Sequence, residues 1–107
     1  MKTFRYIVIL LMLAPLCSAA QSAFQEVRDG NELFRSNNFE GAENKYREGV
    51  RKDGDQFESA YNLGNALYRQ GKFEDAGRYF LQAANKSEDK VRKAQAYHNL
   101  GNSLLKS

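Results

Sequence analysis

The stretch that decides the fold is Tyr61-Asn62-Leu63-Gly64-Asn65-Ala66-Leu67. A second copy follows as His98-Asn99-Leu100-Gly101-Asn102-Ser103-Leu104, and a fainter one precedes it as Arg28-Asp29-Gly30-Asn31-Glu32-Leu33. The three glycines lie 34 and 37 residues apart, a period typical of stacked helical hairpins and not of a globular enzyme domain. The sequence therefore predicts a repeat protein, a class that mostly binds other chains.

The start of the chain has the three zones of a secretory signal. Lys2 and Arg5 form a short basic region, and an apolar run follows over residues 6–16. Ser18-Ala19-Ala20 supplies the small residues that a signal peptidase requires, so we expect cleavage before Gln21. These features predict an exported protein.

We accordingly expect a signal peptide at 1–20 and a single domain at 21–107. Two alternatives remain open for the leader. The first is retention as a membrane anchor, although eleven apolar residues fall short of the roughly 20 that a spanning helix needs. Cys17 offers a lipidation site, but Leu16 stands where a small residue is required.

The charge and the cysteine content of the chain bear on its partners and on its stability. The chain has 16 basic and 13 acidic residues, and cleavage would remove Lys2 and Arg5, leaving a net charge of +1. The pI of about 9.1 thus owes much to the leader and does not indicate nucleic-acid binding. Cleavage would also remove Cys17, the only cysteine, so the mature chain would be stabilised by packing alone.

Apolar residues recur at helical spacing from Phe24 onward, and no strand pattern competes. We expect five helices, at about 24–36, 39–51, 57–70, 73–86 and from about 88 to the end.

The breaks between these helices have local causes. Asn37-Asn38, Gln70-Gly71-Lys72 and Lys52-Asp53-Gly54-Asp55 contain residues that tolerate the left-handed conformation ending a helix. Ser87 can accept hydrogen bonds from the first free amides of the last helix, and Glu88 and Asp89 suit its positive end. The sequence thus predicts tight turns within and between hairpins.

The recurring glycines predict close helix packing. A glycine inside a helix costs about 1 kcal/mol relative to alanine, so its return at one register needs a structural reason. We expect Gly30, Gly64 and Gly101 to let a second helix approach closely. Small residues on the second helices fit this expectation: Ala42, Gly49, Ala76 and Ala83.

The segment 61–83 resembles a tetratricopeptide repeat near its consensus, with the leucine-glycine pair, the Gly-Lys-Phe turn and the final alanine in order. The resemblance implies an all-α tetratricopeptide helical-hairpin solenoid of about two and a half repeats. Its units would span about 23–56, 57–90 and 94–107, and the third has only its first helix. Since about three repeats are normally needed for stability, we expect residues 21–107 alone to be marginally stable or to associate.

More narrowly, Ala60–Phe73 together with Ala96–Leu105 is similar to the small tetratricopeptide component of the Bat (Bacteroides aerotolerance) operon. This resemblance implies a periplasmic partner of membrane-bound von Willebrand A-type proteins, in an envelope complex linked to stress or oxygen tolerance.

The family's pattern also implies a binding surface, because the first helices of stacked hairpins line a concave groove. The groove positions in this chain are Asn31, Phe34, Arg35, Tyr61, Asn62, Asn65, Tyr68, Arg69, His98, Asn99, Asn102 and Lys106. The asparagines recur at one register, and an amide can donate to and accept from the backbone of an extended peptide. The equal alternative is that they are scaffold residues that bond neighbouring helices, and both interpretations stay open.

Arg35, Arg69 and Lys106 also recur and could meet an acidic tail, but solvated positions near negative helix ends explain them better. The carboxylate clamp of chaperone-binding relatives requires lysines where this chain has Val27 and His98. That activity is therefore not expected.

The sequence offers no catalytic centre. His98 is the only histidine, without a second histidine or a mature cysteine to complete a metal site, so it fits a groove position better than a ligand role. Asp53-Gly54-Asp55 lacks the further oxygen donors of a calcium loop. No nucleophile motif or phosphate loop is present. We expect neither enzymatic activity nor a metal, cofactor or small-molecule substrate.

These observations predict a non-catalytic adaptor of the cell envelope that binds a partner's peptide or helix. Self-association through the unpaired last helix is a second expectation. The alternatives are an accessory module of an envelope enzyme, with the activity in another chain or beyond Ser107, and an anchored spacer.

Overall fold

The computed structural model describes residues 19–107, which form five α-helices joined by short turns. These are α2 (Ala19–Arg35), α3 (Phe39–Lys52), α4 (Phe57–Arg69), α5 (Phe73–Lys86) and α6 (Lys90–Lys106). No strand occurs among the described residues, which confirms the all-α prediction. The predicted basic and apolar zones of the signal fall on residues 1–18, outside the described part.

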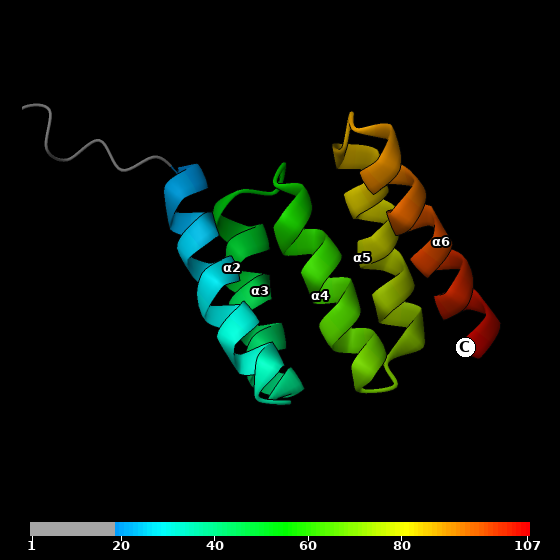
Figure 1. The fold of residues 1–107 in the computed structure, drawn as a ribbon, viewed down its shortest axis with the longest axis horizontal. Helices are drawn as coiled ribbons and strands as arrows, with labels where there is room; N and C mark the ends of the chain where they lie inside the picture. Colours follow the sequence, from blue (N-terminus) through cyan, green and yellow to red (C-terminus); the bar gives the residue numbers. More distant parts are fainter. Residues whose placement is uncertain (1–18) are drawn as a thin grey trace, which may run out of the picture.

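The helices stack as antiparallel hairpins in sequence order (Figure 1). α2 pairs with α3 and α4 pairs with α5, while α6 packs on α5 as the first helix of a third unit. The main core lies between the two complete hairpins, where Tyr46, Leu63, Leu67 and Phe80 are fully buried. A smaller, alanine-rich cluster joins α4, α5 and α6.

The first helix starts earlier than the sequence indicates. We expected it at about Phe24, but α2 is already helical at Ala19. Alanine is the best helix former, and Ala23 is fully buried, so this turn is stabilised both locally and by packing. The cleavage point expected before Gln21 therefore lies inside α2.

Two of the three predicted turn types are correct. Asn37 and Gly71 adopt positive φ angles of 62° and 79°, and each ends the first helix of a hairpin. The turn between the hairpins differs, because Gly54 has no positive φ. Instead, Asp53 is extended and its carboxylate accepts a hydrogen bond from the Asp55 amide at 3.1 Å. Here a side chain closes the turn, so the backbone needs no left-handed residue.

The cap of α6 also corrects the prediction. Asp89, not Ser87, accepts the hydrogen bonds of the first turn, from the amides of Val91 and Arg92. Ser87 is buried and donates to the Asp89 carbonyl. A carboxylate suits this position because it also meets the positive end of the helix dipole.

The glycine prediction holds at two sites and fails at the third. A Cβ atom on Gly30 would lie 2.5 Å from Tyr46, and one on Gly64 would lie 2.7 Å from Phe80. These glycines are notches that receive an aromatic ring of the facing helix. A Cβ on Gly101 would meet nothing within 4 Å, because no helix among residues 19–107 covers this face of α6.

A charged cluster joins the two hairpins. Glu43 on α3 accepts hydrogen bonds from Gln70 at 2.9 Å, Lys72 at 3.1 Å and Arg47 at 2.9 Å. Burial alone would raise the pKa of Glu43, but these three donors hold the pKa below its usual 4.5. Glu43 is therefore charged at neutral pH and fixes the relative position of the hairpins.

Candidate functional site

The side chains of α2, α4 and α6 form a common surface, which we call the first-helix surface. Polar pairs join its neighbouring helices. Asn62 on α4 donates to Asn31 on α2 at 3.4 Å, and Asn99 on α6 donates to the Tyr61 hydroxyl on α4 at 2.8 Å. These bonds align the first helices, so the groove positions of the three units lie in one row.

The three asparagines at the repeated register have different environments. Asn31 accepts a hydrogen bond from the Tyr46 hydroxyl at 2.6 Å, besides the one from Asn62. Burial raises the pKa of Tyr46 to about 12, so this hydroxyl stays protonated and donates at physiological pH. Asn31 thus acts as a scaffold residue in the first unit.

In the second unit Phe80 stands where Tyr46 stands in the first, and a phenyl ring cannot donate a hydrogen bond. Within residues 19–107, the side chain of Asn65 consequently forms no hydrogen bond, and neither does that of Asn102. Both amides keep donors and an acceptor for another molecule.

These free amides lie in one cavity between α4 and α6, which we call the central cavity. It measures about 220 Å³ and is lined by Asn65, Tyr68, Phe80, Asn99 and Asn102. The ring of Phe80 supplies an apolar wall, and the amides supply polar contacts. Small-molecule sites usually measure about 300–1,000 Å³, so this cavity suits a single side chain of a longer ligand better than a whole small molecule.

Two further cavities continue the row. One, of about 310 Å³, is lined by Tyr61, Ala94, Gln95, His98 and Asn99, and lies next to the first along α6. The other, also of about 310 Å³, is lined by Phe24, Val27, Arg28, Asn31, Glu32 and Arg35 on α2. The structure thus gathers Tyr61, Asn65, Tyr68, His98, Asn99 and Asn102 around two adjacent cavities of α4 and α6, and places Asn31 and Arg35 on α2.

Arg69 lies apart from these cavities. Its guanidinium carbon is 4.7 Å from the ring centre of Phe39 and 5.6 Å from that of Phe34, so it packs between the hairpins. Asn62 is also engaged within the fold, through Asn31. These two candidates align the helices that carry the cavities.

Some lining residues escaped the sequence analysis. Phe80 is a buried core residue that the sequence analysis does not name as a groove position, yet its ring also borders the central cavity. Gln95 was not singled out, yet it lies one helical turn before His98 and Asn99 and shares their cavity. Extending the repeated register by one turn toward the start of α6 would have found it.

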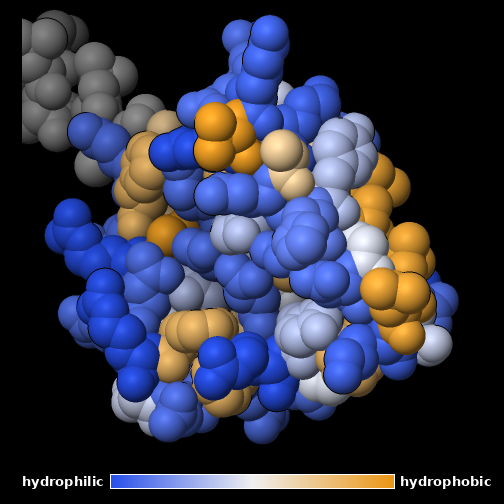
Figure 2. All heavy atoms as spheres, turned by 45° about the vertical axis from the view of Figure 1, so that its right-hand side comes forward, coloured by the Kyte–Doolittle hydropathy of each residue, from blue (hydrophilic) through white to orange (hydrophobic). Residues whose placement is uncertain are grey.

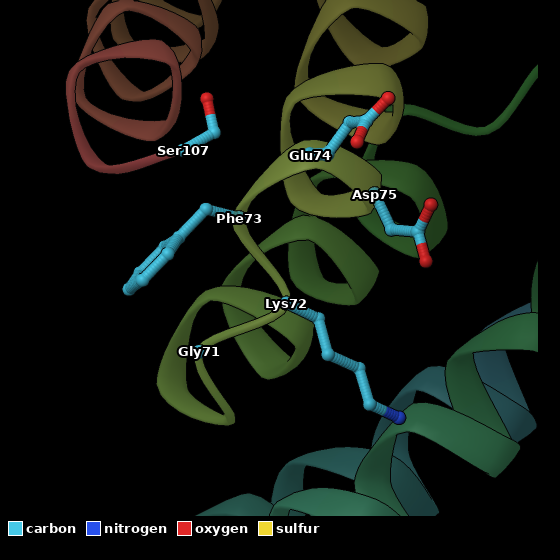
Figure 3. A pocket seen from close by; sticks show the side chains of 6 residues that line it. All are labelled: Gly71, Lys72, Phe73, Glu74, Asp75 and Ser107. Atoms are coloured by element: carbon cyan, nitrogen blue, oxygen red, sulfur yellow. The ribbon is translucent and has the colours of Figure 1, made fainter.

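A separate pocket of about 410 Å³ lies between the α4–α5 turn and the end of α6 (Figure 3). Its polar side chains diverge: Lys72 points away toward α3, where it pairs with Glu43. The Phe73 ring points toward the open side, below Ser107. Without converging polar groups, this pocket has no evident binding chemistry.

Among residues 19–107, no group of three or more His, Cys, Asp or Glu side chains could hold a metal ion. None of the described helices is long and apolar enough to cross a membrane. The cavities of the first-helix surface are lined by amide, hydroxyl and aromatic side chains, which offer hydrogen bonds and apolar contacts.

Comparison with known proteins agrees with this architecture. A family model described as "Tetratricopeptide repeat" matches residues 27–90, from the middle of α2 through α5 to the first residue of α6. No curated protein matches the chain.

Proposed function

The chain belongs to the tetratricopeptide repeat family, and from this premise we propose that it is a scaffold that binds an extended peptide of a partner protein on the first-helix surface. Repeats of this family generally mediate protein–protein interaction and are typically non-catalytic. The observation that carries the proposal is the central cavity, where the unbonded amides of Asn65 and Asn102 lie beside Phe80.

An extended peptide fits these groups for a physical reason. Its backbone has a donor and an acceptor at each residue, and the carboxamides of Asn65 and Asn102 offer the complementary acceptor and donors. One side chain of the peptide would enter the 220 Å³ cavity against Phe80. The neighbouring cavity at Tyr61 and His98 would take a second side chain further along the same peptide.

The experiment compares partners captured by the full chain and by two double variants. Asn65→Ala with Asn102→Ala removes the unbonded amides, and Asn44→Ala with Asn85→Ala removes two exposed amides from the second helices as a control. We expect mass spectrometry of the captured proteins to show partners lost only with the first pair. A partner set that is the same for both double variants would refute peptide binding at this cavity.

We further propose that the scaffold works in the cell envelope. The support is the signal-like pattern of residues 1–20, and N-terminal sequencing of the protein purified from envelope fractions tests it. Cleavage before Gln21 is expected. An intact Met1 in the cytosolic fraction would contradict export, whereas an intact Met1 in the membrane fraction would favour the anchored spacer.

Within the envelope, we propose a Bat-type complex with membrane-bound von Willebrand A-type proteins as the peptide's source. This assignment rests on the similarity of residues 60–73 and 96–105 to the small tetratricopeptide component of that system. Such proteins should appear among the Asn65-dependent partners. Capture of an envelope enzyme instead would favour the accessory-module alternative, and capture of the chain itself would favour self-association.

A further inference from the structure

A second surface lies on α6, facing away from α5, and we call it the α6 stripe. It consists of Tyr97, Gly101, Leu104 and Leu105, which share one helix face by their spacing of three, four and eight residues. Tyr97 is 44 % exposed, Leu104 is 64 % exposed and Leu105 is 86 % exposed. Figure 2, which turns the α6 end forward, shows hydrophobic side chains at the surface there among mostly hydrophilic ones.

The same register on α4 is completely covered. Ala60, Gly64 and Leu67 correspond to Tyr97, Gly101 and Leu104, and Ala60 and Leu67 are both 0 % exposed. The cover on α4 is the antiparallel helix α5, which places Phe80 in the notch at Gly64.

The first hairpin repeats this arrangement with different residues. There α3 covers α2 and places Tyr46 in the notch at Gly30. In both covering helices a fully buried alanine precedes the aromatic residue by one turn, namely Ala42 before Tyr46 and Ala76 before Phe80. The chain thus contains two examples of the helix that fits a stripe of this kind: antiparallel, with alanine and an aromatic residue four positions apart.

The two hairpins also differ at an equivalent phenylalanine near the end of the stack. Phe39 of the first unit is contacted by the guanidinium of Arg69 at 4.7 Å. Phe73, at the same position in the second unit, packs edge-on against Tyr68 at 5.0 Å and borders the open pocket beside Ser107 (Figure 3).

The charge of α6 indicates which charge a helix bound to the α6 stripe should carry. The helix contains Lys90, Arg92, Lys93 and Lys106 and no acidic residue. Arg92 is paired with Glu58 at 2.8 Å, but no ion pair joins Lys90 or Lys93 to another described residue. Lys90 continues the α6 stripe toward the start of the helix, and Lys93 lies at its edge.

The first hairpin shows how a charged residue near the start of a first helix pairs with the helix that covers it. Glu26 on α2, at the register of Tyr97, binds Lys52 in the last turn of α3 at 2.7 Å. On α6 the charge at this end is reversed, so the last turns of the covering helix should be acidic.

We propose that the α6 stripe binds an amphipathic helix of a partner protein, antiparallel to α6, with an aromatic ring at Gly101, a small residue one turn earlier and acidic residues in its last turns. A second copy of this chain fits less well. Two α6 stripes facing each other would bring together helices that each carry four basic residues, and the notch-filling rings Tyr46 and Phe80 are buried in their own hairpins. The α6 stripe is separate from the central cavity, so a peptide and a helix can be held at once.

The test uses a fluorescent peptide with the α5 sequence 73–86 in which Gln82 and Lys86 are replaced by glutamate. A lactam between Glu74 and the lysine of an Arg78→Lys substitution, both on the exposed side of α5, keeps it helical. Anisotropy titrations with the full chain should show saturable binding. We expect binding to weaken about tenfold or more when alanine replaces Phe80 in the peptide, since a buried aromatic anchor carries much of the affinity of such an interface.

Two variants of the chain locate the binding. Gly101→Leu fills the notch, and because a Cβ there meets nothing within 4 Å, the fold should be retained, as circular dichroism can verify. It should weaken peptide binding about tenfold, and Lys90→Glu with Lys93→Glu should weaken it severalfold. Asn65→Ala with Asn102→Ala should leave it unchanged, which separates this proposal from the peptide-binding function.

Three results would overturn the proposal. The first is equal binding of the peptide to the wild-type chain and to Gly101→Leu. The second is a dimer in sedimentation experiments that Gly101→Leu abolishes, which would assign the α6 stripe to a second copy. The third is loss of peptide binding in a longer form of the chain, which would assign the stripe to a segment that follows Ser107.

Discussion

Gly64 and Gly101 have the same neighbours in sequence, Asn-Leu before and Asn after, but opposite surroundings. At Gly64 a Cβ atom would collide with the buried ring of Phe80, whereas at Gly101 it would meet no atom of the described residues within 4 Å. One motif therefore marks a filled notch in the second hairpin and an open one on α6. The comparison teaches that a glycine's role in a repeat depends on the helix that faces it.

The strongest way to break this comparison is to remove the ring that fills the notch. Phe80→Ala should lower the free energy of unfolding by about 3–5 kcal/mol, because it leaves a cavity among fully buried side chains. Urea denaturation followed by circular dichroism measures this loss of stability. In so small a domain, a loss of this size should leave most of the protein unfolded.

Leu105→Ala on the α6 stripe is the matched control. Leu105 is 86 % exposed, so its loss should change the free energy of unfolding by no more than about 0.5 kcal/mol. If both substitutions cost the same, the α6 stripe is covered in solution and the contrast between the two notches is wrong.

A single methyl group at each glycine sharpens the contrast. Gly64→Ala should lower the free energy of unfolding by about 1–3 kcal/mol, since the fully buried Phe80 ring has no room to move away. Gly101→Ala should raise it by about 0.5–1 kcal/mol, because alanine favours the helix and nothing opposes the methyl group. The same urea experiment measures both. Changes of the same sign would contradict the difference in packing.

The stabilisation that Glu43 provides between the two hairpins should depend on pH. The pKa of Glu43 is lower in the folded chain than its usual 4.5, so the unfolded chain binds a proton first as the pH falls. The stabilisation is complete above about pH 5 and is lost as the pH drops below 4.5 toward the folded pKa.

Glu43→Gln should therefore lower the free energy of unfolding by about 1 kcal/mol at pH 7, a modest value because Lys72 and Arg47 are half exposed to solvent. The difference between wild type and variant should shrink toward pH 3. Denaturation curves at several pH values test this, and a difference that stays constant with pH would rule out the carboxylate's charge as the cause.

A substitution of similar size separates the two filled notches from each other. Tyr46→Phe makes the first hairpin resemble the second and removes the hydroxyl that bonds Asn31, so it should cost about 1 kcal/mol. Thermal denaturation can detect this change, with Tyr97→Phe as a control on an exposed ring. An unchanged melting temperature would mean that Asn31 is no more committed to the scaffold than Asn65.

Much of this fold could be predicted because its signals are local. Helical periodicity, the left-handed Asn37 and Gly71, and the recurring glycines place α3, α4 and α5 to within one residue. The wrong predictions lie where a local sequence pattern is compatible with two structures. Both Ser87 and Asp89 are good caps, and only the packing that buries Ser87 leaves the role to Asp89.

The candidate site could be predicted as a row of positions but not as a set of roles. The register places Asn31, Asn65 and Asn102 on first helices, and sequence reasoning leaves peptide binding and scaffold bonding equally open for all three. The structure separates them through a residue 15 positions away from Asn31, the Tyr46 whose hydroxyl engages it.

The sequence by itself determined that this protein is a stack of helical hairpins, since spacing, turn residues and repeat length act within a few turns of the chain. Only the tertiary structure decided which notch is filled, and, among residues 19–107, which asparagine side chain has no hydrogen bond and which face of α6 no helix covers. Those properties depend on side chains brought together from different helices. A tyrosine opposite Asn31, a phenylalanine opposite Asn65 and no described helix opposite Gly101 give three copies of one motif three different roles.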